Sequence, residues 1–255
     1  MRFPFTPLTC LLLVAACHRE GRSPEITVAA AANLTGVFQV LGARFEAASG
    51  IHPVFSFGST AQITQQIENS APYDVIAAAD SEHVAQLERH GLLLPGSRAV
   101  YAIGILVLWI PPGSTAMVSR LEDLTLPDVH AIAVAKPELA PYGQAAVDTL
   151  RQLGIWEKVK SKIVYAGNIG MAKQYGSSNN ADAVFTAYSL VQKSGGKVIA
   201  VDEKMHQPIT QELGIVAASH HRESARKFVT FLLTGEGRDI LSKSGYRVPP
   251  NPKRY

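Results

Sequence analysis

The sequence predicts an α/β fold of two lobes, each built on a mostly parallel sheet flanked by helices. Three observations indicate this. Short apolar strands alternate with amphipathic helices along the chain, a pattern typical of parallel sheets with helices on both faces. A chain of 255 residues, 47% of them hydrophobic, has enough apolar side chains for one large domain or two lobes. The apolar run 100–110 is long enough to leave one lobe and enter the next.

Residues 1–16 are predicted to be a signal peptide, because a charged start precedes an apolar run too short to span a membrane. The run ends in Val-Ala-Ala-Cys, which resembles a bacterial lipobox and would make Cys17 the lipidated first residue; ordinary cleavage before Cys17 is the alternative. Residues 17–24 are then a lipid-anchor linker, and the protein is expected to be periplasmic or extracytoplasmic. Cys10 and Cys17 are the only cysteines, so no disulfide is expected after cleavage.

Three strand–helix units follow this leader. Residues 26–32 form the first strand, and Asn33 stands at the N-cap of a helix that Gly50 ends. The apolar stripe of this helix comprises Leu34, Val37, Phe38, Leu41 and Phe45.

The second strand comprises residues 54–57, and after a glycine Ser59 or Thr60 opens the next helix. The apolar face of that helix holds Ile63 and Ile67. Repeated units of this kind, with short links, predict a parallel sheet.

The third strand comprises residues 74–79 and is followed by a helix that Asp80 or Ser81 caps. The long run 100–110 is β-branched and aromatic, which favours a strand, with Gly104 as its expected bend.

The remaining elements alternate in the same way. Further strands are predicted at residues 131–135, 163–165, 183–187 and 198–201, and helices at 121–124, after 140–143, after 166–170, and at 188–193, 223–233 and 235–243. Residues 174–182 are polar and rich in Gly, Ser and Asn, so a surface excursion is expected there.

Residues 209–217 are predicted to be a strand that returns to the first lobe. We therefore assign residues 25–102 and 210–255 to lobe 1 and residues 103–209 to lobe 2, joined by two crossing strands.

The turn at Ser59 and Thr60 predicts an anion site that has no cationic side chain. Such a turn leaves the first helical N–H groups unpaired at the positive end of the helix, and the hydroxyls add donors. Similar turns recur at Asn33, Tyr142 and Ile169. Because ligands bind at the carboxyl ends of strands in such sheets, we expect these turns to surround one small tetrahedral oxyanion between the lobes.

Several segments together resemble the periplasmic molybdate-binding proteins of molybdate ABC transporters. They are Ala30-Ala31-Ala32-Asn33-Leu34, Ser56-Phe57-Gly58-Ser59-Thr60, Gln66-Ile67-Glu68, residues 71–80 and 141–146, and Gly245-Tyr246. The resemblance covers nearly all of the mature chain. It implies the two-lobed fold of periplasmic solute-binding proteins with a hinge of crossing strands. It further implies a monomer without cofactor that binds molybdate, and tungstate, with high affinity for an ABC permease and its ATPase.

The resemblance assigns ligand contacts residue by residue. Asn33 matches a polar position, serine in many relatives, and is expected to donate its side-chain amide. Ser59 matches the binding-serine region, and either its hydroxyl or that of Thr60 makes the contact. Tyr142 matches a position that is alanine in some relatives, a backbone donor, and tyrosine in others. Ile169 matches an aliphatic residue that contributes its N–H at a helix start.

A fully deprotonated oxyanion presents only acceptors, so a dry cleft lined by donors suffices to bind it. Ala187 stands where some relatives place a tyrosine hydroxyl, which Tyr142 is expected to supply instead. Sulfate or phosphate is the alternative ligand. A secreted hydrolase or transferase with Ser59 as nucleophile is the less favoured function, since no evident base follows this residue. A receptor that reports oxyanion level without transport is a third reading.

Charge and histidine content suggest no other partner. The net charge is +3 with basic residues spread along the chain, and the short tail Lys253-Arg254 makes no nucleic-acid patch. The adjacent pair His220-His221 lacks the spacing of a metal pair on one helix face, and His83 and His90 are expected to be surface residues rather than ligands.

Overall fold

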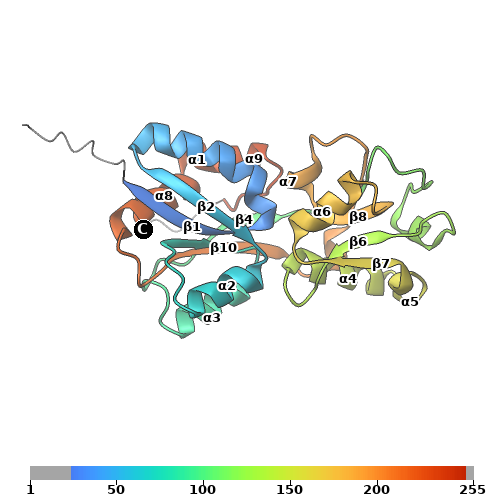
Figure 1. Ribbon diagram of the computed structural model, residues 1–255, viewed down its shortest axis with the longest axis horizontal. Helices are drawn as coiled ribbons and strands as arrows, with labels where there is room; N and C mark the ends of the chain where they lie inside the picture. The colour runs from blue at the N-terminus through green and yellow to red at the C-terminus, as the bar shows by residue number, and fades with distance from the viewer. Residues whose placement is uncertain (1–23, 251–255) are drawn as a thin grey trace, which may run out of the picture.

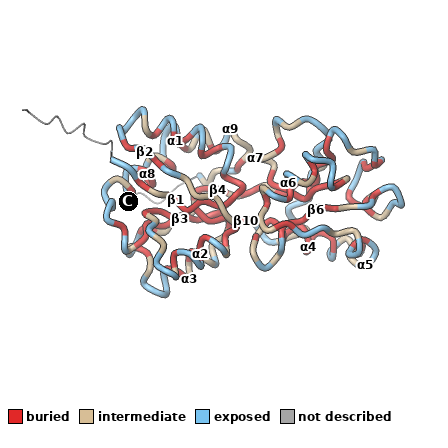
Figure 2. Tube along the Cα trace, viewed as in Figure 1, coloured by how far each residue is buried: buried red, intermediate tan, exposed pale blue. Residues whose placement is uncertain are grey.

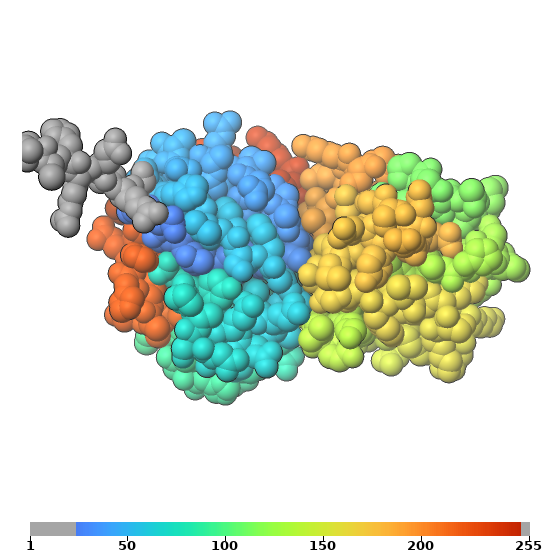
Figure 3. All heavy atoms as spheres, in the orientation of Figure 1, coloured from blue at the N-terminus to red at the C-terminus, as the bar shows by residue number. Residues whose placement is uncertain are grey.

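The computed structural model describes residues 24–250, and Figure 1 shows two lobes side by side, each with a central sheet and flanking helices. The side chains of the two lobes are in contact along their boundary on the face in Figure 3. The predicted signal peptide, the lipidation of Cys17 and the basic tail lie outside the described residues. Within the described range, no helix has both the length and the hydropathy needed to cross a membrane.

The sheet of lobe 1 has the strand order β2-β1-β3-β10-β4. Its strands are β1 (Glu25–Ala31), β2 (His52–Gly58), β3 (Val75–Ala77), β4 (Ala99–Gly104) and β10 (Ile209–Ile215). β1 pairs in parallel with β2 and β3, whereas β10 runs antiparallel between β3 and β4. The three predicted strand–helix units thus form the parallel part of this sheet.

Helices cover both faces of the lobe 1 sheet. One face carries α1 (Thr35–Ser49), α8 (Arg222–Leu233) and α9 (Gly235–Lys243), and the other carries α2 (Thr60–Glu68) and α3 (Glu82–Arg89). The predicted stripe of α1 is buried, and its Phe38 and Phe45 pack edge-on against Phe228 of α8, with ring centres 6.1 and 5.2 Å apart. Ile63 and Ile67 of α2 are buried as predicted. Figure 2 shows the buried residues concentrated in the sheets and on the inner helix faces.

The sheet of lobe 2 has the strand order β7-β6-β8-β5-β9. Its strands are β5 (Leu106–Ile110), β6 (Ile132–Ala135), β7 (Ile163–Ala166), β8 (Ala183–Ala187) and β9 (Lys197–Ala200). β6 pairs in parallel with β7 and β8, and β5 runs antiparallel to β8 and β9. The helices are α4 (Pro141–Gln152), α5 (Trp156–Val159), α6 (Ile169–Ser177) and α7 (Tyr188–Val191), with short 3₁₀ turns η2 (Leu121–Thr125), η3 (Lys160–Lys162) and η4 (Glu203–Met205).

The chain crosses between the lobes twice. β4 ends at Gly104 and β5 begins at Leu106, so the apolar run that predicts one bent strand is divided between the two sheets, with its break at Ile105, directly after the expected glycine. β10 follows β9 of lobe 2 and re-enters the sheet of lobe 1, as predicted. These two crossings are the hinge between the lobes.

Two local predictions are wrong. Asn33 is not an N-cap, because residues 32–34 form a 3₁₀ turn, η1 (Ala32–Leu34), and α1 starts after Leu34. The segment 174–182 is only partly an excursion, since α6 continues to Ser177. The continuation is explained by Gly176, which is buried and lets the helix approach the side chain of Trp109 closely. The polar residues around Gly176 in the sequence give no sign of this contact.

Candidate functional site

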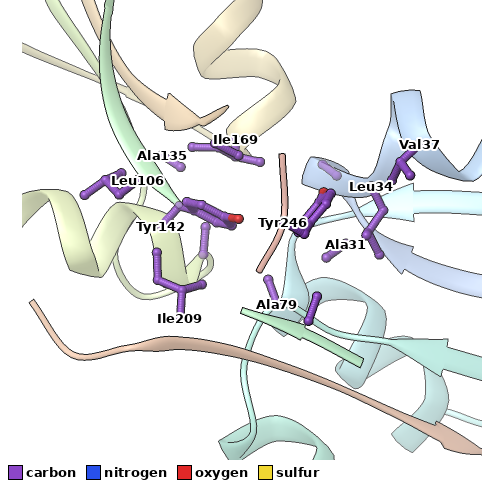
Figure 4. Packing of buried hydrophobic residues seen from close by; sticks show 14 of the residues in the cluster. Ala31, Leu34, Val37, Ala79, Leu106, Ala135, Tyr142, Ile169, Ile209 and Tyr246 are labelled. Carbon is purple, nitrogen blue, oxygen red and sulfur yellow. The ribbon is translucent and has the colours of Figure 1, made fainter. Parts of the chain in front are cut away.

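A small cavity lies between the lobes, beyond the carboxyl ends of strands from both sheets. Its lining consists of Ala31, Ala32, Asn33, Gly58, Ser59, Thr60, Ala79, Ala140, Pro141, Tyr142, Asn168 and Ile169. All five residues that the sequence predicts as ligand contacts are in this lining. Figure 4 shows Tyr142 and Ile169 on the lobe 2 side and Ala31 and Ala79 on the lobe 1 side. The structure therefore brings the predicted turns together at one place.

Three helices begin at the cavity, and each presents backbone donors to it. Thr60 and Ile169 are the first residues of α2 and α6, and Tyr142 is the second residue of α4, after a proline. Within residues 24–250, none of their N–H groups donates to a protein acceptor. This is expected for the first turn of a helix, where the peptide dipoles also leave partial positive charge. An anion at this position meets three converging donors.

Ser59 and Thr60 have different roles, although they are neighbours. Ser59 is the N-cap of α2: its Oγ accepts from Gln62 N at 3.3 Å and donates to Gln62 Oε1 at 2.9 Å. Thr60 Oγ1 accepts from Ala79 N at 3.1 Å. The hydroxyl proton of Ser59 is thus shared within a capping box, whereas that of Thr60 has no protein acceptor among the described residues.

Asn33 is 1% exposed, and its side chain contacts buried groups of the protein instead of capping the start of α1. Its Nδ2 donates to Gln211 Oε1 and to Tyr246 Oη, both at 3.0 Å. Its Oδ1 is buried and has no hydrogen-bond partner among the described residues. Both amide hydrogens are therefore occupied in this arrangement. The prediction that this amide donates to the ligand has no support here, although Asn33 is among the lining residues.

Tyr142 comes from α4 and points its hydroxyl toward lobe 1, as Figure 4 shows. Its Oη accepts a hydrogen bond from Gln211 Nε2 at 3.0 Å. Because an amide nitrogen can only donate, the proton of Tyr142 is not used in that bond. Tyr142 is thus placed to donate to a ligand.

Burial raises the pKa of three tyrosines at this place, Tyr101, Tyr142 and Tyr246. The cause is the cost of placing a phenolate in a desolvated environment. All three keep their hydroxyl protons at neutral pH. They are donors and acceptors here, and none is an anion that would repel an oxyanion.

No charged side chain lines the cavity. A search of the described range also finds no group of three or more His, Cys, Asp or Glu residues that could hold a metal ion. The hydroxyl of Ser59 contacts a glutamine, which cannot serve as a general base. The lining is suited to binding an acceptor-rich solute, and it lacks the groups that a Ser59 nucleophile would need.

The lobes are closed over the cavity. Ala61 N, in the first turn of α2, donates to Leu139 O of lobe 2 at 3.2 Å, and Ser189 Oγ of lobe 2 donates to Asn33 O at 3.2 Å. The volume open to the centre of a water-sized sphere is about 10 Å³, which is room for about one water molecule.

Other residues considered from sequence lie elsewhere. Ala187 is buried at the end of β8 opposite Leu106 and is not in the lining. Each of three histidines approaches a carboxylate through its Nδ1; these pairs are His83–Asp80, His90–Glu68 and His221–Asp74.

Sequence reasoning missed the residues behind the lining. Gln211, Tyr101 and Tyr246 come from β10, β4 and the C-terminal segment, and all three are buried. Thr210 and Glu212 flank Gln211 in β10, so no local pattern in the strand singles this glutamine out. Asn168 lies in the predicted turn 166–170, and its Oδ1 caps α6 by accepting from Met171 N at 2.9 Å.

Comparison with known proteins agrees with this geometry. Residues 26–247 match the family model of the bacterial extracellular solute-binding proteins. The chain is 32% identical to the molybdate-binding protein ModA of Rhodobacter capsulatus, over 93% of this chain and 94% of the relative. It is also 32% identical to ModA of Azotobacter vinelandii, over 96% and 99%.

The solved structure of the periplasmic molybdate-binding protein of Azotobacter vinelandii superimposes on this chain with a TM-score of 0.83, at 31% identity. The match covers 88% of this chain and 99% of that one. The chain belongs to the bacterial extracellular solute-binding protein family.

Proposed function

We propose that the protein binds molybdate in the cleft between its lobes and delivers it to an ABC transporter outside the cytoplasm. The observation that carries this proposal is the convergence of unpaired N–H groups from α2, α4 and α6 on a lining without charged side chains. The similarity to molybdate-binding proteins over nearly the whole chain supports the choice of ligand.

The donor set suits a fully deprotonated tetrahedral oxyanion. Each oxygen of such an ion accepts hydrogen bonds and offers no proton, so backbone N–H and hydroxyl donors can surround it. We assign the contacts to the N–H groups of Thr60, Tyr142 and Ile169, to the hydroxyls of Thr60 and Tyr142, and to the main chain of Asn33. Ser59 contributes by holding the turn through its capping box and can turn its hydroxyl toward the ligand. Tungstate has the same shape and charge and is proposed as a second ligand.

The experiment is isothermal titration of the purified secreted protein with molybdate, tungstate, sulfate and phosphate. We expect one-to-one binding of molybdate and tungstate, and no heat of binding with sulfate or phosphate. Binding of sulfate or phosphate alone would retain the fold and change the ligand. The absence of a heat of binding with all four anions would contradict the proposal. A Tyr142→Ala and Thr60→Ala double variant is the matched negative control, since it lacks both proposed hydroxyl donors.

The membrane-side partners and the anchor are part of the same proposal. We infer a permease and an ATPase as partners, a monomeric binding protein, and a lipid on Cys17. The anchor inference rests on the Val-Ala-Ala-Cys sequence alone. Mass spectrometry of the mature N-terminus tests it, and an unmodified first residue would contradict it. Size-exclusion chromatography with light scattering tests the monomer.

A further inference from the structure

We propose that Gln211 is a positioning residue of the anion site, which turns the hydroxyl proton of Tyr142 toward the ligand. This inference rests on the proposed function, because it concerns how that site presents its donors. Gln211 lies on β10, the strand that returns from lobe 2 to lobe 1. Its side chain is fully buried, and it does not line the cavity itself.

The two ends of the Gln211 amide face different lobes. Oε1 accepts from Asn33 Nδ2 at 3.0 Å and lies 2.8 Å from Tyr101 Oη, both in lobe 1. Nε2 donates to Tyr142 Oη of lobe 2 at 3.0 Å. Gln211 therefore connects groups of both lobes at the crossing of the hinge strands.

The direction of these hydrogen bonds follows from the chemistry of the partners. Tyr246 Oη donates its proton to Asn33 O at 2.7 Å, so the Asn33 side-chain atom beside the Tyr246 oxygen has to be the donating nitrogen, and the Gln211 atom that faces this nitrogen has to be the oxygen. A turned Gln211 would set two N–H groups against each other and leave both unpaired, which is costly in a buried position. Asn33 thus fixes the orientation of Gln211, and Gln211 in turn presents a donor to Tyr142.

The consequence for Tyr142 is that its oxygen accepts and its proton stays free. Among the described residues no acceptor takes this proton. Burial raises the pKa of Tyr142, so the proton is retained. The site then presents an O–H to the ligand, as an acceptor-only oxyanion requires. If Gln211 presented its oxygen instead, Tyr142 would donate its hydroxyl proton to Gln211 and would have none left for the ligand.

Packing holds the pair in place. Gly104, the last residue of β4, lies against both side chains: a Cβ at this position would lie 2.7 Å from Gln211 Nε2 and would collide with Tyr142 Oη. The β10–β4 pairing also shifts register between Gln211 and Glu212, a local irregularity that bends the strand and re-aims its side chains.

The test is a double-mutant cycle with Gln211→Met and Tyr142→Phe. Methionine keeps the length of the side chain and fills space without hydrogen bonds. Molybdate titration should show Gln211→Met weakening binding about tenfold in the protein that keeps Tyr142, the loss expected of one hydrogen bond to a charged ligand. In the Tyr142→Phe background, the same change should alter affinity less than about twofold, because it has no hydroxyl left to orient.

Equal losses in both backgrounds would overturn the proposal, because Gln211 would then act through the structure in general. Unchanged affinity in Gln211→Met would overturn it as well. Thr210→Val is the control: Thr210 is the half-buried neighbour on β10, its side chain points to the other face of the strand, and it makes no side-chain hydrogen bond within the described residues. Its effect should be the same in both Tyr142 backgrounds.

Two further arms keep the outcome decisive. If Gln211→Met does not fold, Gln211→Leu replaces it; leucine also removes the hydrogen bonds of Gln211 and adds neither a charge nor a new acceptor for the Tyr142 hydroxyl, so the cycle still isolates that hydroxyl. If the wild-type protein binds none of the four anions, the proposed function fails separately. The Gln211–Tyr142 hydrogen bond is then measured from the same cycle on urea unfolding, where strict additivity would contradict it.

Discussion

Gly104 lies directly against the hydroxyl of Tyr142, at the point where the chain leaves lobe 1 for lobe 2. A Cβ at position 104 would collide with Tyr142 Oη. The glycine therefore makes room for the one tyrosine hydroxyl in the lining of the cavity, and it does so at the break between β4 and β5. Gly104 therefore serves both the predicted break between the two strands and the anion site.

Gly104→Ala is expected to weaken molybdate binding at least tenfold, because the new methyl group displaces the Tyr142 hydroxyl from Gln211. It should also lower the free energy of unfolding by about 1–3 kcal/mol, as overpacking does in a filled interior. Titration and urea unfolding measure the two effects. Gly36→Ala is the control: Gly36 is exposed in α1 with nothing near its Cβ position. It should leave affinity unchanged and stabilise the helix by roughly 0.5–1 kcal/mol.

Thr60→Val is expected to weaken anion binding by about 1–3 kcal/mol, since the Thr60 hydroxyl is proposed as a ligand donor. Ser59→Ala should act mainly on stability, costing about 0.5–2 kcal/mol through the lost N-cap of α2. Calorimetric titration and thermal unfolding of both variants separate the roles. Thr60→Ser retains a hydroxyl and should bind nearly as well as the wild type. A larger affinity loss in Ser59→Ala than in Thr60→Val would reverse the assignment.

Anion affinity is expected to stay constant from about pH 7 to about pH 10, the ordinary pKa of tyrosine. Burial raises the pKa of Tyr142 and Tyr246, so both hydroxyls keep their protons over this range and none is lost as a donor. Titrations at several pH values in one ionic strength test this. A decline in affinity below pH 10 that Tyr142→Phe abolishes would show that Tyr142 ionises in the ordinary range.

His83 is expected to make stability depend on pH. Its hydrogen bond to Asp80, 2.8 Å from Nδ1 to Oδ2, raises the pKa of His83 above its ordinary value of 6.5. The resulting stabilisation is complete below the unfolded pKa and is lost as pH rises through the folded pKa. The wild type should therefore exceed His83→Gln in unfolding free energy by more at about pH 5.5 than at about pH 8.5. Asp80→Asn should reduce this difference, and an identical gap at both pH values would contradict the role of the pair.

Asp74→Asn is expected to destabilise lobe 1 without changing affinity. Asp74 Oδ1 accepts from Ser219 Oγ at 2.6 Å and Oδ2 accepts from Thr27 N at 2.8 Å, so one carboxylate joins two loops and β1. An amide leaves one of these donors unpaired, at a cost of about 1–3 kcal/mol. Urea unfolding measures the loss. A change in molybdate affinity beyond about twofold, equivalent to roughly 0.4 kcal/mol, would show coupling to the distant site.

The sequence predicts the alternation of strands and helices because each element carries its own pattern. Ile63 and Ile67 recur at helical spacing, Gly50 ends α1 in a left-handed conformation at φ 70°, and the run 100–110 breaks directly after its glycine. These are local signals. They were sufficient to identify the turns that line the cavity.

The interior behind those turns was not predictable in the same way. Asn33 reads as an N-cap, but its amide finds better partners in Gln211 and Tyr246, which are 178 and 213 residues away along the chain. Hydrogen bonds over such separations leave no periodic pattern in a single sequence. The extension of α6 to Ser177 was missed for a related reason, since Gly176 packs on Trp109 of a different strand.

The position of β10 has a consequence for the order of folding. This strand is the last to be synthesised, yet it lies between β3 and β4 within the sheet of lobe 1. Lobe 2 has all its strands in one continuous stretch, β5 to β9, and its contacts can form without the rest of the chain. Lobe 1 cannot complete its sheet until residues 209–215 have been synthesised, because β3 and β4 each have an edge that only β10 pairs with. Such pairings of distant segments are slow. A chain emerging from a narrow export channel would thus keep lobe 1 open until residues 209–215 have passed through.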